Sequence, residues 1–599
     1  MINGLSEWAE QNNMPIEPED VQTCYQRVLK RHNPVITRQG GLNPATQRAA
    51  LPTRSVATPP SSDDVPMMYR AQVSGRCSLM YAAESKDRST WLQEWKHHNS
   101  ASVDQPPEYQ YEIQESYDIN PSVYSFTIKF PYRVLTNSGQ DSILRPPIGG
   151  FGIPYIPGSS IKGLLRRLLH SPDISDADKT AIKTYCGTVD QPGKVRFLGA
   201  FPIGDWAANC LDVVHPQQKR QVEADDTTSA YALISFSQPE LIMELSSDDP
   251  TLPWPEIEAL LRQAMRLGLG GKTSTGYGFA EPPRFTEPTH PCYASALHFD
   301  LSGKGVTSTL LTGRHEFRPN CFKAALRGHV RRLLAGVCNT PEQVNNIADQ
   351  FFGSTGAEGS IQLYWDSPNG SYDETYDVEG ILHLAARSPG SSDLDFIAKV
   401  LEFAYVMAGF GKSWRRVWHH DFFPTYYSSG DGRFPIGCHW QSSKTIIQTS
   451  EQLKAFLDQL HSDCQRSYGS TPPVRLTWRE TWSPNNVAVF CKQTSTSSEA
   501  IKLFHDRRFQ GTPAIDGKHV GGQRPEYVSC IWHRMLPIPG NQYLEIVTLF
   551  HGGATREHWR RQGSGDQLPD VLNWLTAKCF AQAWGNSVPL TARPVLRRR

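Results

Sequence analysis

The fold of this chain of 599 residues is decided by the stretch Tyr155-Ile156-Pro157-Gly158-Ser159-Ser160-Ile161-Lys162-Gly163-Leu164-Leu165-Arg166-Arg167-Leu168-Leu169. Pro157 and Gly158 break the incoming chain, and either Ser159 or Ser160 is expected to cap the helix that follows. The apolar side chains of this helix recur at helical spacing and form a single stripe. The stretch therefore predicts an amphipathic helix that packs on a core.

The basic side chains of this helix lie away from the apolar stripe. Lys162 and Arg166 are four residues apart on one face, and Arg167 is beside them. A Gly-Ser-Ser turn that opens a basic helix presents free amides and the positive end of the helix dipole to an anion. This pattern predicts a phosphate-binding helix. An ordinary capped surface helix has the same parts, so the spacing alone leaves both interpretations open.

A glycine-rich segment follows an expected helix over residues 257–265, and it reads Gly268-Leu269-Gly270-Gly271-Lys272-Thr273-Ser274-Thr275-Gly276-Tyr277-Gly278. Its glycines allow positive φ and close backbone approach, so its amides are expected to face a phosphate. Lys272 adds a point charge, and the ring of Tyr277 is expected to stack on a base. A plain surface turn has a similar composition.

Three motifs resemble a known family. The run Ile-Pro-Gly-Ser-Ser-Ile-Lys-Gly-Leu-Leu-Arg resembles the signature of the RAMP superfamily, the RNA-binding subunits of CRISPR effector complexes. The segment 268–278 resembles the glycine-rich loop of that family. Between them, Leu211-Asp212-Val213-Val214-His215-Pro216 resembles a stretch typical of the sixth Cmr subunit of type III-B complexes. The three motifs occur in the expected order and span roughly residues 120 to 285.

The composition limits the class of protein. Sixty basic and sixty acidic side chains cancel, which argues against a free-standing electrostatic nucleic-acid binder but leaves room for locally basic grooves. No apolar run is long enough for a membrane span, and the first residues do not resemble a signal peptide. No membrane partner is therefore expected. Twelve cysteines without a Cys-x-x-Cys pair predict reduced thiols in a cytoplasmic protein and no structural zinc site.

The order of expected elements predicts an α+β fold with two tandem ferredoxin-like RAMP domains that carry insertions. Residues 1–65 are polar and are expected to form an arm or linker. The first domain, 66–288, is expected to have strands at 124–130, 194–198, 232–236 and 241–245, the last two as a pair. The second, divergent domain is 289–599 and includes C-terminal additions, with helices expected at 450–464 and 568–584 and a strand at 544–550.

The expected elements and motifs of the first domain recur in the second. A strand is expected at 297–301, a basic helix over 317–332, a strand at 360–364 and an amphipathic helix over 396–404. Lys323 and Arg327 are four residues apart, as Lys162 and Arg166 are. Phe351-Phe352-Gly353 stands where Tyr185-Cys186-Gly187 stands in the first domain. These parallels predict two divergent copies of one domain.

An RNA strand is held by phosphate contacts and by base stacking, and both domains supply candidates for these contacts. After the second amphipathic helix, basic residues interleave with tryptophans in Lys412-Ser413-Trp414-Arg415-Arg416-Val417-Trp418, which suits a nucleic-acid groove or a core tryptophan pair under solvated arginines. The predicted RNA-binding residues are Ser159, Ser160, Lys162, Arg166, Arg167, Gly270, Gly271, Lys272, Thr273, Tyr277, Arg318, Lys323, Arg327, Lys412, Trp414, Arg415 and Arg416.

Asp141 is the candidate catalytic residue. The resemblance implies this role, because type III backbone subunits cut target RNA with an aspartate in the loop before the basic helix, and Asp141 is the only acid between Leu135 and Arg167. Such cutting would need Mg²⁺ or Mn²⁺; otherwise no cofactor is expected. Relatives of the sixth-subunit type do not generally cut, so a solvated loop carboxylate is the favoured interpretation. The matching loop of the second domain has only Glu316, and no cutting is expected there.

The main hypothesis is an RNA-binding structural subunit of a type III, Cmr-like CRISPR ribonucleoprotein in antiviral defence. Its expected partners are crRNA, target RNA, the RAMP backbone subunits and the large subunit. One alternative is an enzyme that cuts target RNA through Asp141 or processes guide RNA through His170 or His215. Another is an assembly scaffold. The run His419-His420-Asp421 is not expected to bind metal, because adjacent histidines point in different directions.

Overall fold

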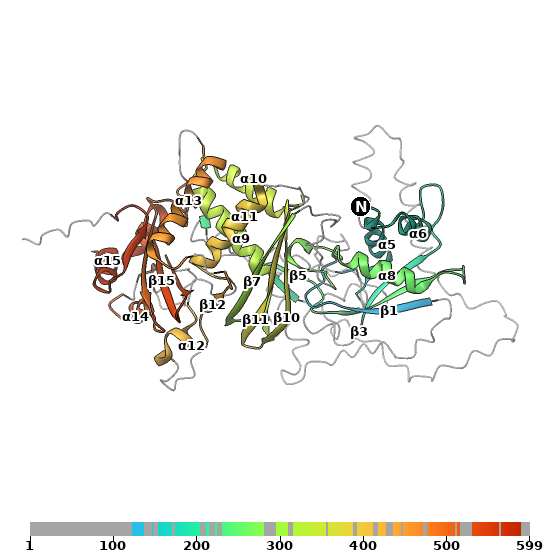
Figure 1. The fold of residues 1–599 in the computed structure, drawn as a ribbon, viewed down its shortest axis with the longest axis horizontal. Helices are drawn as coiled ribbons and strands as arrows, with labels where there is room; N and C mark the ends of the chain where they lie inside the picture. The colour runs from blue at the N-terminus through green and yellow to red at the C-terminus, as the bar shows by residue number, and fades with distance from the viewer. Residues whose placement is uncertain are drawn as a thin grey trace, which may run out of the picture. The chain divides into compact units, whose positions relative to one another are not determined.

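The computed structural model describes eighteen stretches of the chain, which belong to one compact unit spanning residues 61–599. They are 123–136, 146–147, 154–170, 174–203, 211–214, 222–223, 231–280, 295–309, 315–354, 357–386, 392–410, 417–426, 435–444, 447–470, 476–509, 512–515, 530–561 and 565–588. The predicted arm at 1–65 lies outside them. Within the described stretches the fold is mixed α+β, with three four-stranded antiparallel sheets and three two-stranded ones (Figure 1).

The first sheet has the strand order β1-β6-β3-β2 and carries the helix on which the sequence analysis is centred. Its strands are β1 (Val123–Lys129), β2 (Ile156–Pro157), β3 (Arg196–Ile203) and β6 (Glu240–Ser246). Helices α5 (Gly158–Arg167), α6 (Asp176–Cys186) and α8 (Trp254–Met265) pack with it, and the fully buried side chains of Ile161, Leu165 and Leu241 lie in its core.

One expected strand pair in this region is wrong. Residues 232–236 and 241–245 do not pair with each other. Instead β5 (Tyr231–Ile234) pairs with β4 (Leu211–Val214), and β6 lies between β1 and β3. Both strands that flank β6, β1 and β3, pair with it over its full length, so β6 has no free edge for residues 232–236.

The second sheet has the strand order β10-β11-β7-β12. Its strands are β7 (Ser295–Val306), β10 (Ile361–Tyr372), β11 (Thr375–Ala386) and β12 (Cys438–Gln441). Its helices are α9 (Asn320–Ala335), α10 (Pro341–Phe352) and α11 (Ser392–Met407), and α9 and α11 lie on one side of the sheet (Figure 1). The predicted strand at 297–301 and the predicted helix over 396–404 fall within β7 and α11 and are confirmed. The predicted strand at 360–364 and helix over 317–332 are also confirmed, although β10 begins at Ile361 and α9 at Asn320.

The third sheet has the strand order β14-β15-β13-β18. Its strands are β13 (Val487–Thr494), β14 (Ile531–Ile538), β15 (Gln542–Phe550) and β18 (Ala581–Trp584), and its helices are α14 (Glu499–His505) and α15 (Leu568–Ala577). Helix α13 (Ser450–Tyr468) packs against β18. The remaining short elements are η3 (Leu168–His170), η4 (Thr273–Thr275), β8 (Ser308–Thr309), β9 (His315–Glu316), α12 (His419–Phe422), η5 (Pro424–Tyr426), η6 (Gly553–Trp559), β16 (Arg560–Arg561) and β17 (Gly565–Asp566).

The predicted helix over 568–584 is too long. Helix α15 ends at Ala577, and the chain turns there because Cys579 takes a left-handed φ of 62° and the amide of Phe580 donates back to the carbonyl of Leu575. The following residues form β18 instead. The predictions at 450–464 and 544–550 are confirmed by α13 and β15.

The second and third sheets share one hydrophobic core. Trp482 is fully buried and its ring stacks between Trp532, at 5.7 Å between centroids, and Trp584, at 5.3 Å. Trp482 also packs edge-on against Phe403 of helix α11, which belongs to the second sheet. Because a fully buried aromatic side chain is worth several kcal/mol, roughly 3–5 on truncation, this tryptophan stack ties the two sheets together.

The turn after the second helix is the same in the first two sheets. Helix α6 is capped at its start by the side chain of Ser175 and ends at Gly187, with φ 81° and ψ 166°. Helix α10 is capped by Thr340 and ends at Gly353, with φ 78° and ψ 164°. A side chain at either glycine would collide with the following backbone. The predicted equivalence of these two turns is therefore confirmed at the level of backbone conformation.

Candidate nucleic-acid interface

Helix α5 presents its basic face to solvent as the spacing predicts. Ile161, Leu164 and Leu165 are buried, whereas Lys162 is half-buried and Arg166 is exposed. Among the described residues neither cation forms an ion pair. Burial raises the pKa of the nearby Cys186 thiol to about 11, and the positive charges of both side chains act in the opposite direction. The two positive charges are thus available to a ligand at the end of α6.

The start of α5 differs from the expectation in one respect. The helix begins at Gly158, the N-cap residue is Pro157, and no side chain in the described part of the chain caps it. Ser159 and Ser160 are exposed residues of the first turn and do not act as caps. The predicted serine cap is wrong because Gly158 packs directly against the carbonyl of Phe197 and belongs to the first turn, which places the N-cap at Pro157, two residues before Ser159. The first-turn amides therefore have no side-chain oxygen bound to them.

Arg167 joins this helix to the glycine-rich segment. Its guanidinium donates to the carbonyl oxygens of Gly268, at 3.3 Å, and Leu267, at 3.4 Å. These carbonyls follow the end of α8, where a cation is favoured by the helix dipole. Arg167 therefore holds the segment in place from α5.

The glycine-rich segment lies beside residues 133–135, and Leu135 and Gly271 form an isolated β-bridge. The amide of Gly271 donates to the carbonyl of Leu135 at 2.6 Å, and the amide of Gly278 donates to that of Arg133 at 2.9 Å. Gly270 has a φ of 80°, and a Cβ there would lie 2.1 Å from the carbonyl oxygen of Leu135. Two of the amides expected to face a phosphate are thus engaged by the sheet. Lys272 takes the left-handed conformation and turns the chain into η4.

Tyr277 is not placed for base stacking. Its side chain is only 2% exposed, and Asn320 at the start of α9 donates to its hydroxyl at 3.4 Å. A ring buried in this way has no free face for a base, so the expected stacking role is wrong for this conformation. Tyr277 instead connects the glycine-rich segment to helix α9 through this hydrogen bond.

The basic residues of the second sheet are largely engaged within the chain. Arg327 donates to the carbonyl of Gly353 at 2.8 Å and forms an ion pair with Asp349. Lys323 donates to the hydroxyl of Ser274 in the glycine-rich segment at 2.5 Å. Arg327 is therefore committed to the turn after α10, whereas Lys323 contacts only a neutral partner among the described residues.

Glu316 has a structural contact. The buried guanidinium of Arg133 donates to both carboxylate oxygens of Glu316, each at 2.8 Å, and Arg318 donates to it at 3.3 Å. Arg133 also donates to the hydroxyl of Ser235 at 3.0 Å. A bidentate pair of this kind fixes geometry. The sequence analysis did not select Arg133, because its partner lies 183 residues away.

Five predicted site residues lie outside the described stretches. They are Asp141, Lys412, Trp414, Arg415 and Arg416. Trp418, just beyond them, is buried at 8% exposure and packs with Phe422 and Met535. In the part of the chain that the structure describes, no group of three or more His, Cys, Asp or Glu residues could hold a metal ion. No helix there is long and apolar enough to cross a membrane.

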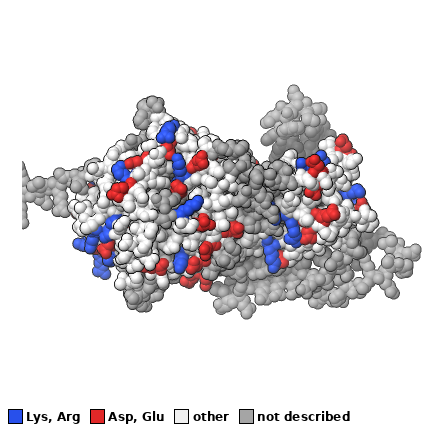
Figure 2. Space-filling model, in the orientation of Figure 1, with Lys and Arg blue, Asp and Glu red and all other residues white. Residues whose placement is uncertain are grey.

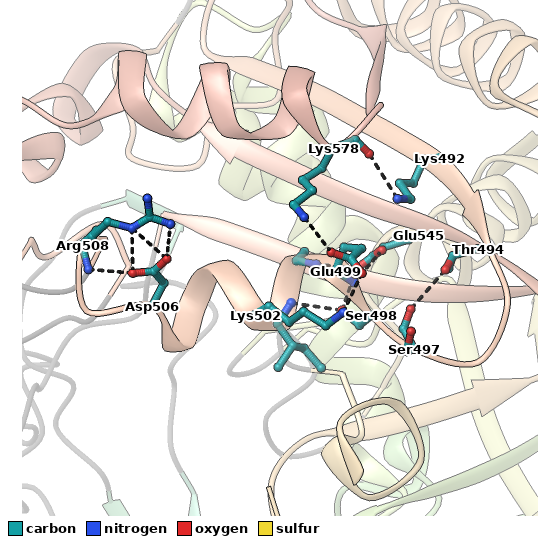
Figure 3. A network of polar contacts seen from close by, with 12 residues as sticks. Lys492, Thr494, Ser497, Ser498, Glu499, Lys502, Asp506, Arg508, Glu545 and Lys578 are labelled. Atoms are coloured by element: carbon teal, nitrogen blue, oxygen red, sulfur yellow. Dashed lines mark hydrogen bonds and ion pairs between the residues drawn. The ribbon is translucent and has the colours of Figure 1, made fainter. Parts of the chain in front are cut away.

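The start of helix α14, in the third sheet, is already occupied by a carboxylate of the chain itself. The carboxylate of Glu545 on β15 accepts the amide of Ala500 at 2.8 Å, the amide of Glu499 at 3.1 Å and the hydroxyl of Ser498 at 2.6 Å (Figure 3). Burial by itself raises the pKa of the Glu545 carboxyl, but these bonds and His533 more than offset it and leave the pKa below its ordinary value. Helix α14 thus carries its own internal anion.

The surface charge is mixed. On the face shown in Figure 2, Lys and Arg side chains alternate with Asp and Glu and do not gather into one continuous basic field. Exposed ion pairs such as Lys194–Asp249 and Arg196–Asp248 neutralise one another. On this face, binding of a polyanion would therefore depend on particular cations rather than on a broad positive surface.

The comparisons with known proteins agree with the motifs in the first part of the chain. The model of the RAMP superfamily matches residues 127–281, which contain α5, α8 and the glycine-rich segment. The comparison with curated proteins gives no match.

Several solved structures resemble this chain. One is a cryo-EM structure of the type III-B Cmr-β complex bound to cognate target RNA, at 19% identity and a TM-score of 0.22, which covers 26% of this chain and 58% of that chain. Two are crystal structures from Pyrococcus furiosus. Cmr1 in its apo form has 12% identity and a TM-score of 0.30, and the match covers 48% of this chain and 99% of Cmr1. Cmr6 has 21% identity and a TM-score of 0.19, and the match covers 27% of this chain and 98% of Cmr6.

Proposed function

We propose that this chain is an RNA-binding structural subunit of a type III, Cmr-like CRISPR effector that holds guide RNA and the guide–target duplex. The observation that carries the proposal is the basic face of α5, Lys162 and Arg166, which forms no ion pair with the residues that the structure describes and lies inside the segment that matches the RAMP superfamily. Its partners are crRNA, target RNA and other effector subunits, among them backbone subunits and the large subunit. We propose that the first domain corresponds to the sixth Cmr-type subunit, because the stretch 211–216 resembles that subunit.

The proposed architecture is a series of ferredoxin-like units. Each of the second and third sheets has four strands, and from one edge of the sheet to the other these are the second, third, first and fourth in sequence. Helices follow the first and third strands in sequence, as a ferredoxin-like unit requires. In the first sheet β3, β6 and β1 hold the corresponding three places, and the glycine-rich segment lies at the fourth. We therefore extend the expected two units to three. The domain boundaries after residues 65 and 288 remain predictions.

The test of the proposal is the loss of RNA affinity when the basic face of α5 is removed. The double variant Lys162→Ala, Arg166→Ala should weaken binding of single-stranded RNA on the order of tenfold, because two phosphate contacts are lost. The loss should be larger at low salt, since phosphate contacts release counterions. Fluorescence anisotropy of a labelled RNA measures the affinity, and a thermal melt checks the fold.

A matched control is available on the neighbouring helix. Lys179 and Lys183 of α6 are also four residues apart, so Lys179→Ala with Lys183→Ala removes the same charge from the same domain. This control should retain nearly all of the affinity. Equal losses in both double variants would mean diffuse electrostatics, and an unchanged affinity in the α5 variant with a normal melt would remove the phosphate-binding role.

A further inference from the structure

Three lysines that are far apart in the sequence converge on the third sheet. Lys492 lies near the end of β13, Lys502 is on α14, and Lys578 follows α15 directly. The ammonium of Lys502 donates to one carboxylate oxygen of Glu499 at 2.6 Å, and that of Lys578 lies 3.6 Å from the other (Figure 3). Lys492 donates to the backbone carbonyl of Lys578 at 3.1 Å. Three cations therefore surround one carboxylate.

This single carboxylate does not balance the charge of the three lysines. The pKa of the Glu499 carboxyl lies below its ordinary value, because Lys502 donates to it and the charges of all three lysines favour its ionised form, while desolvation acts in the opposite direction. Glu545 is bound to the amides and the hydroxyl at the start of α14. Among the described residues Lys492 forms no ion pair. The site therefore retains a surplus of positive charge.

The lysines are accessible to a ligand. The side chains of Lys502 and Lys578 are 50% and 47% exposed, and Lys492 is half-buried. Residues 495–497, which carry three exposed hydroxyls, immediately precede the start of α14. Beyond the other end of this helix, Arg507 is exposed and forms no ion pair with the residues that the structure describes. Hydrogen-bond donors of the kind that bind phosphate oxygens therefore lie at both ends of α14.

The composition of this surface fits a phosphate backbone better than a protein partner. Protein interfaces are depleted in lysine and have apolar side chains at their centre, whereas nucleic-acid interfaces are polar and strongly positive. The large apolar side chains that are exposed in the described stretches are Val189, Leu198 and Ile381, and they lie outside the third sheet and its helices. The chemistry of the site therefore favours a polyanion whose charges are phosphates.

We infer that Lys492, Lys502 and Lys578 form a phosphate-binding site for single-stranded RNA on the third unit, in addition to the basic face of α5. The identity of the polyanion rests on the proposed function. The site lies outside residues 127–281, which match the RAMP superfamily. Glu499 is its internal competitor, because it holds the ammonium groups when RNA is absent and a phosphate must displace it from them.

Loss of the lysines tests the site in the full-length chain. The double variant Lys492→Met, Lys578→Met should bind a labelled single-stranded RNA on the order of tenfold more weakly at low salt, because two phosphate contacts are lost. The slope of log affinity against log salt should become shallower by about 1.4, or about 0.7 for each contact. Lys502→Met is a second, single variant and should weaken binding about threefold. Fluorescence anisotropy measures the affinities, and thermal melts establish that each variant is folded.

Glu499→Gln separates a binding site from a network that only stabilises the fold. It removes the competing carboxylate and leaves the three lysines, so RNA should bind about threefold more tightly. A purely structural network predicts no such gain. The matched control is Lys179→Met with Lys454→Met, which removes two lysines that each pair with an acid on their own helix, α6 or α13. This control should keep its RNA affinity within about twofold of wild type.

The outcomes are distinct from those of the proposed function. If wild type does not bind RNA, both the function and this inference are wrong. If wild type binds RNA and the lysine variants and Glu499→Gln all match it, the site on the third unit is wrong while the function stands. A loss in Lys492→Met, Lys578→Met but not in Lys162→Ala, Arg166→Ala supports this site and removes the role of α5. If the lysine variants keep their RNA affinity but no longer associate with a neighbouring effector subunit, the lysines bind a protein carboxylate, which overturns the inference.

Discussion

Three arginines on helix α9 form ion pairs with carboxylates that lie elsewhere in the sequence. Each has a partner from another element, and the pairs are Arg327 with Asp349, Arg331 with Glu223, and Arg332 with Glu480. In the sequence these residues make α9 appear as basic as α5. Arg327, which is predicted to bind RNA, donates to the carbonyl of Gly353 and pairs with Asp349. Sequence spacing reveals a charge but not the distant group that neutralises it.

The pair between Arg332 and Glu480 gives a test at the scale of single residues. Both side chains are fully buried, and the guanidinium also lies over the ring of Trp532. Glu480→Gln leaves a buried cation without its carboxylate, so the free energy of unfolding should fall by about 3–5 kcal/mol. Chemical denaturation measures the change. The exposed Glu379→Gln is the control and should change stability by less than about 0.5 kcal/mol.

A second variant shows whether the cost belongs to the unpaired charge. Adding Arg332→Met to Glu480→Gln should recover part of the lost stability, because only one of the two buried cations that Glu480 contacts, Arg479, is then left without its carboxylate. A loss below about 1 kcal/mol for Glu480→Gln alone would contradict the account of this pair as a buried ionic contact.

The helices were predictable because their signals are local. Periodic apolar residues and the residues at their ends identified α5, α8, α9, α11 and α13. Strand partners were less predictable, since pairing depends on residues far apart in the chain. The pair expected between 232–236 and 241–245 failed for this reason, and so did the recognition of the third sheet, whose strands β13 and β15 are separated by a long connection.

The start of helix α5 gives a test at the scale of one element. A Cβ at Gly158 would lie 1.8 Å from the carbonyl oxygen of Phe197, whereas a Cβ at Gly163, in the same helix, meets nothing within 4 Å. Gly158→Ala should therefore destabilise the protein by about 2 kcal/mol or more, because the helix must move away from β3. Gly163→Ala should stabilise it by about 0.5–1 kcal/mol.

Both variants replace glycine by alanine on helix α5. The difference between their free energies of unfolding therefore reports the close contact between Gly158 and Phe197. Denaturant unfolding followed by circular dichroism gives both free energies. Equal stabilities would mean that α5 does not pack against Phe197 as closely as the structure has it.

At the scale of the whole molecule, half of the candidate interface could be predicted from the sequence. The exposed face of Lys162 and Arg166 follows from helical periodicity alone. The contact between Lys323 and Ser274, 49 residues apart, and the pair between Arg133 and Glu316, 183 residues apart, do not. These contacts exist only because the units pack together, and they turn expected RNA-binding residues such as Tyr277 into structural ones. In the third unit the start of α14 is occupied by the carboxylate of Glu545.

The remaining question for the whole molecule is whether it cuts RNA, and Asp141 decides it. The argument for chemistry is positional, since Asp141 is the only acid in the Gly/Pro-rich sequence before α5, the position at which the resemblance implies a catalytic aspartate. The argument against is chemical. A divalent cation needs several oxygen ligands, and the sequence between Leu135 and Arg167 supplies no second carboxylate.

We therefore expect Asp141→Ala to leave every target cleavage site of the assembled effector intact. Labelled target RNA is incubated with wild-type and variant complexes in magnesium or manganese, and the products are resolved on a denaturing gel. RNA affinity, measured on the same preparations, separates lost chemistry from lost binding. If one discrete product band disappears while binding is retained, Asp141 positions the metal or the attacking 2′-hydroxyl, and this chain is a nuclease rather than a purely structural subunit.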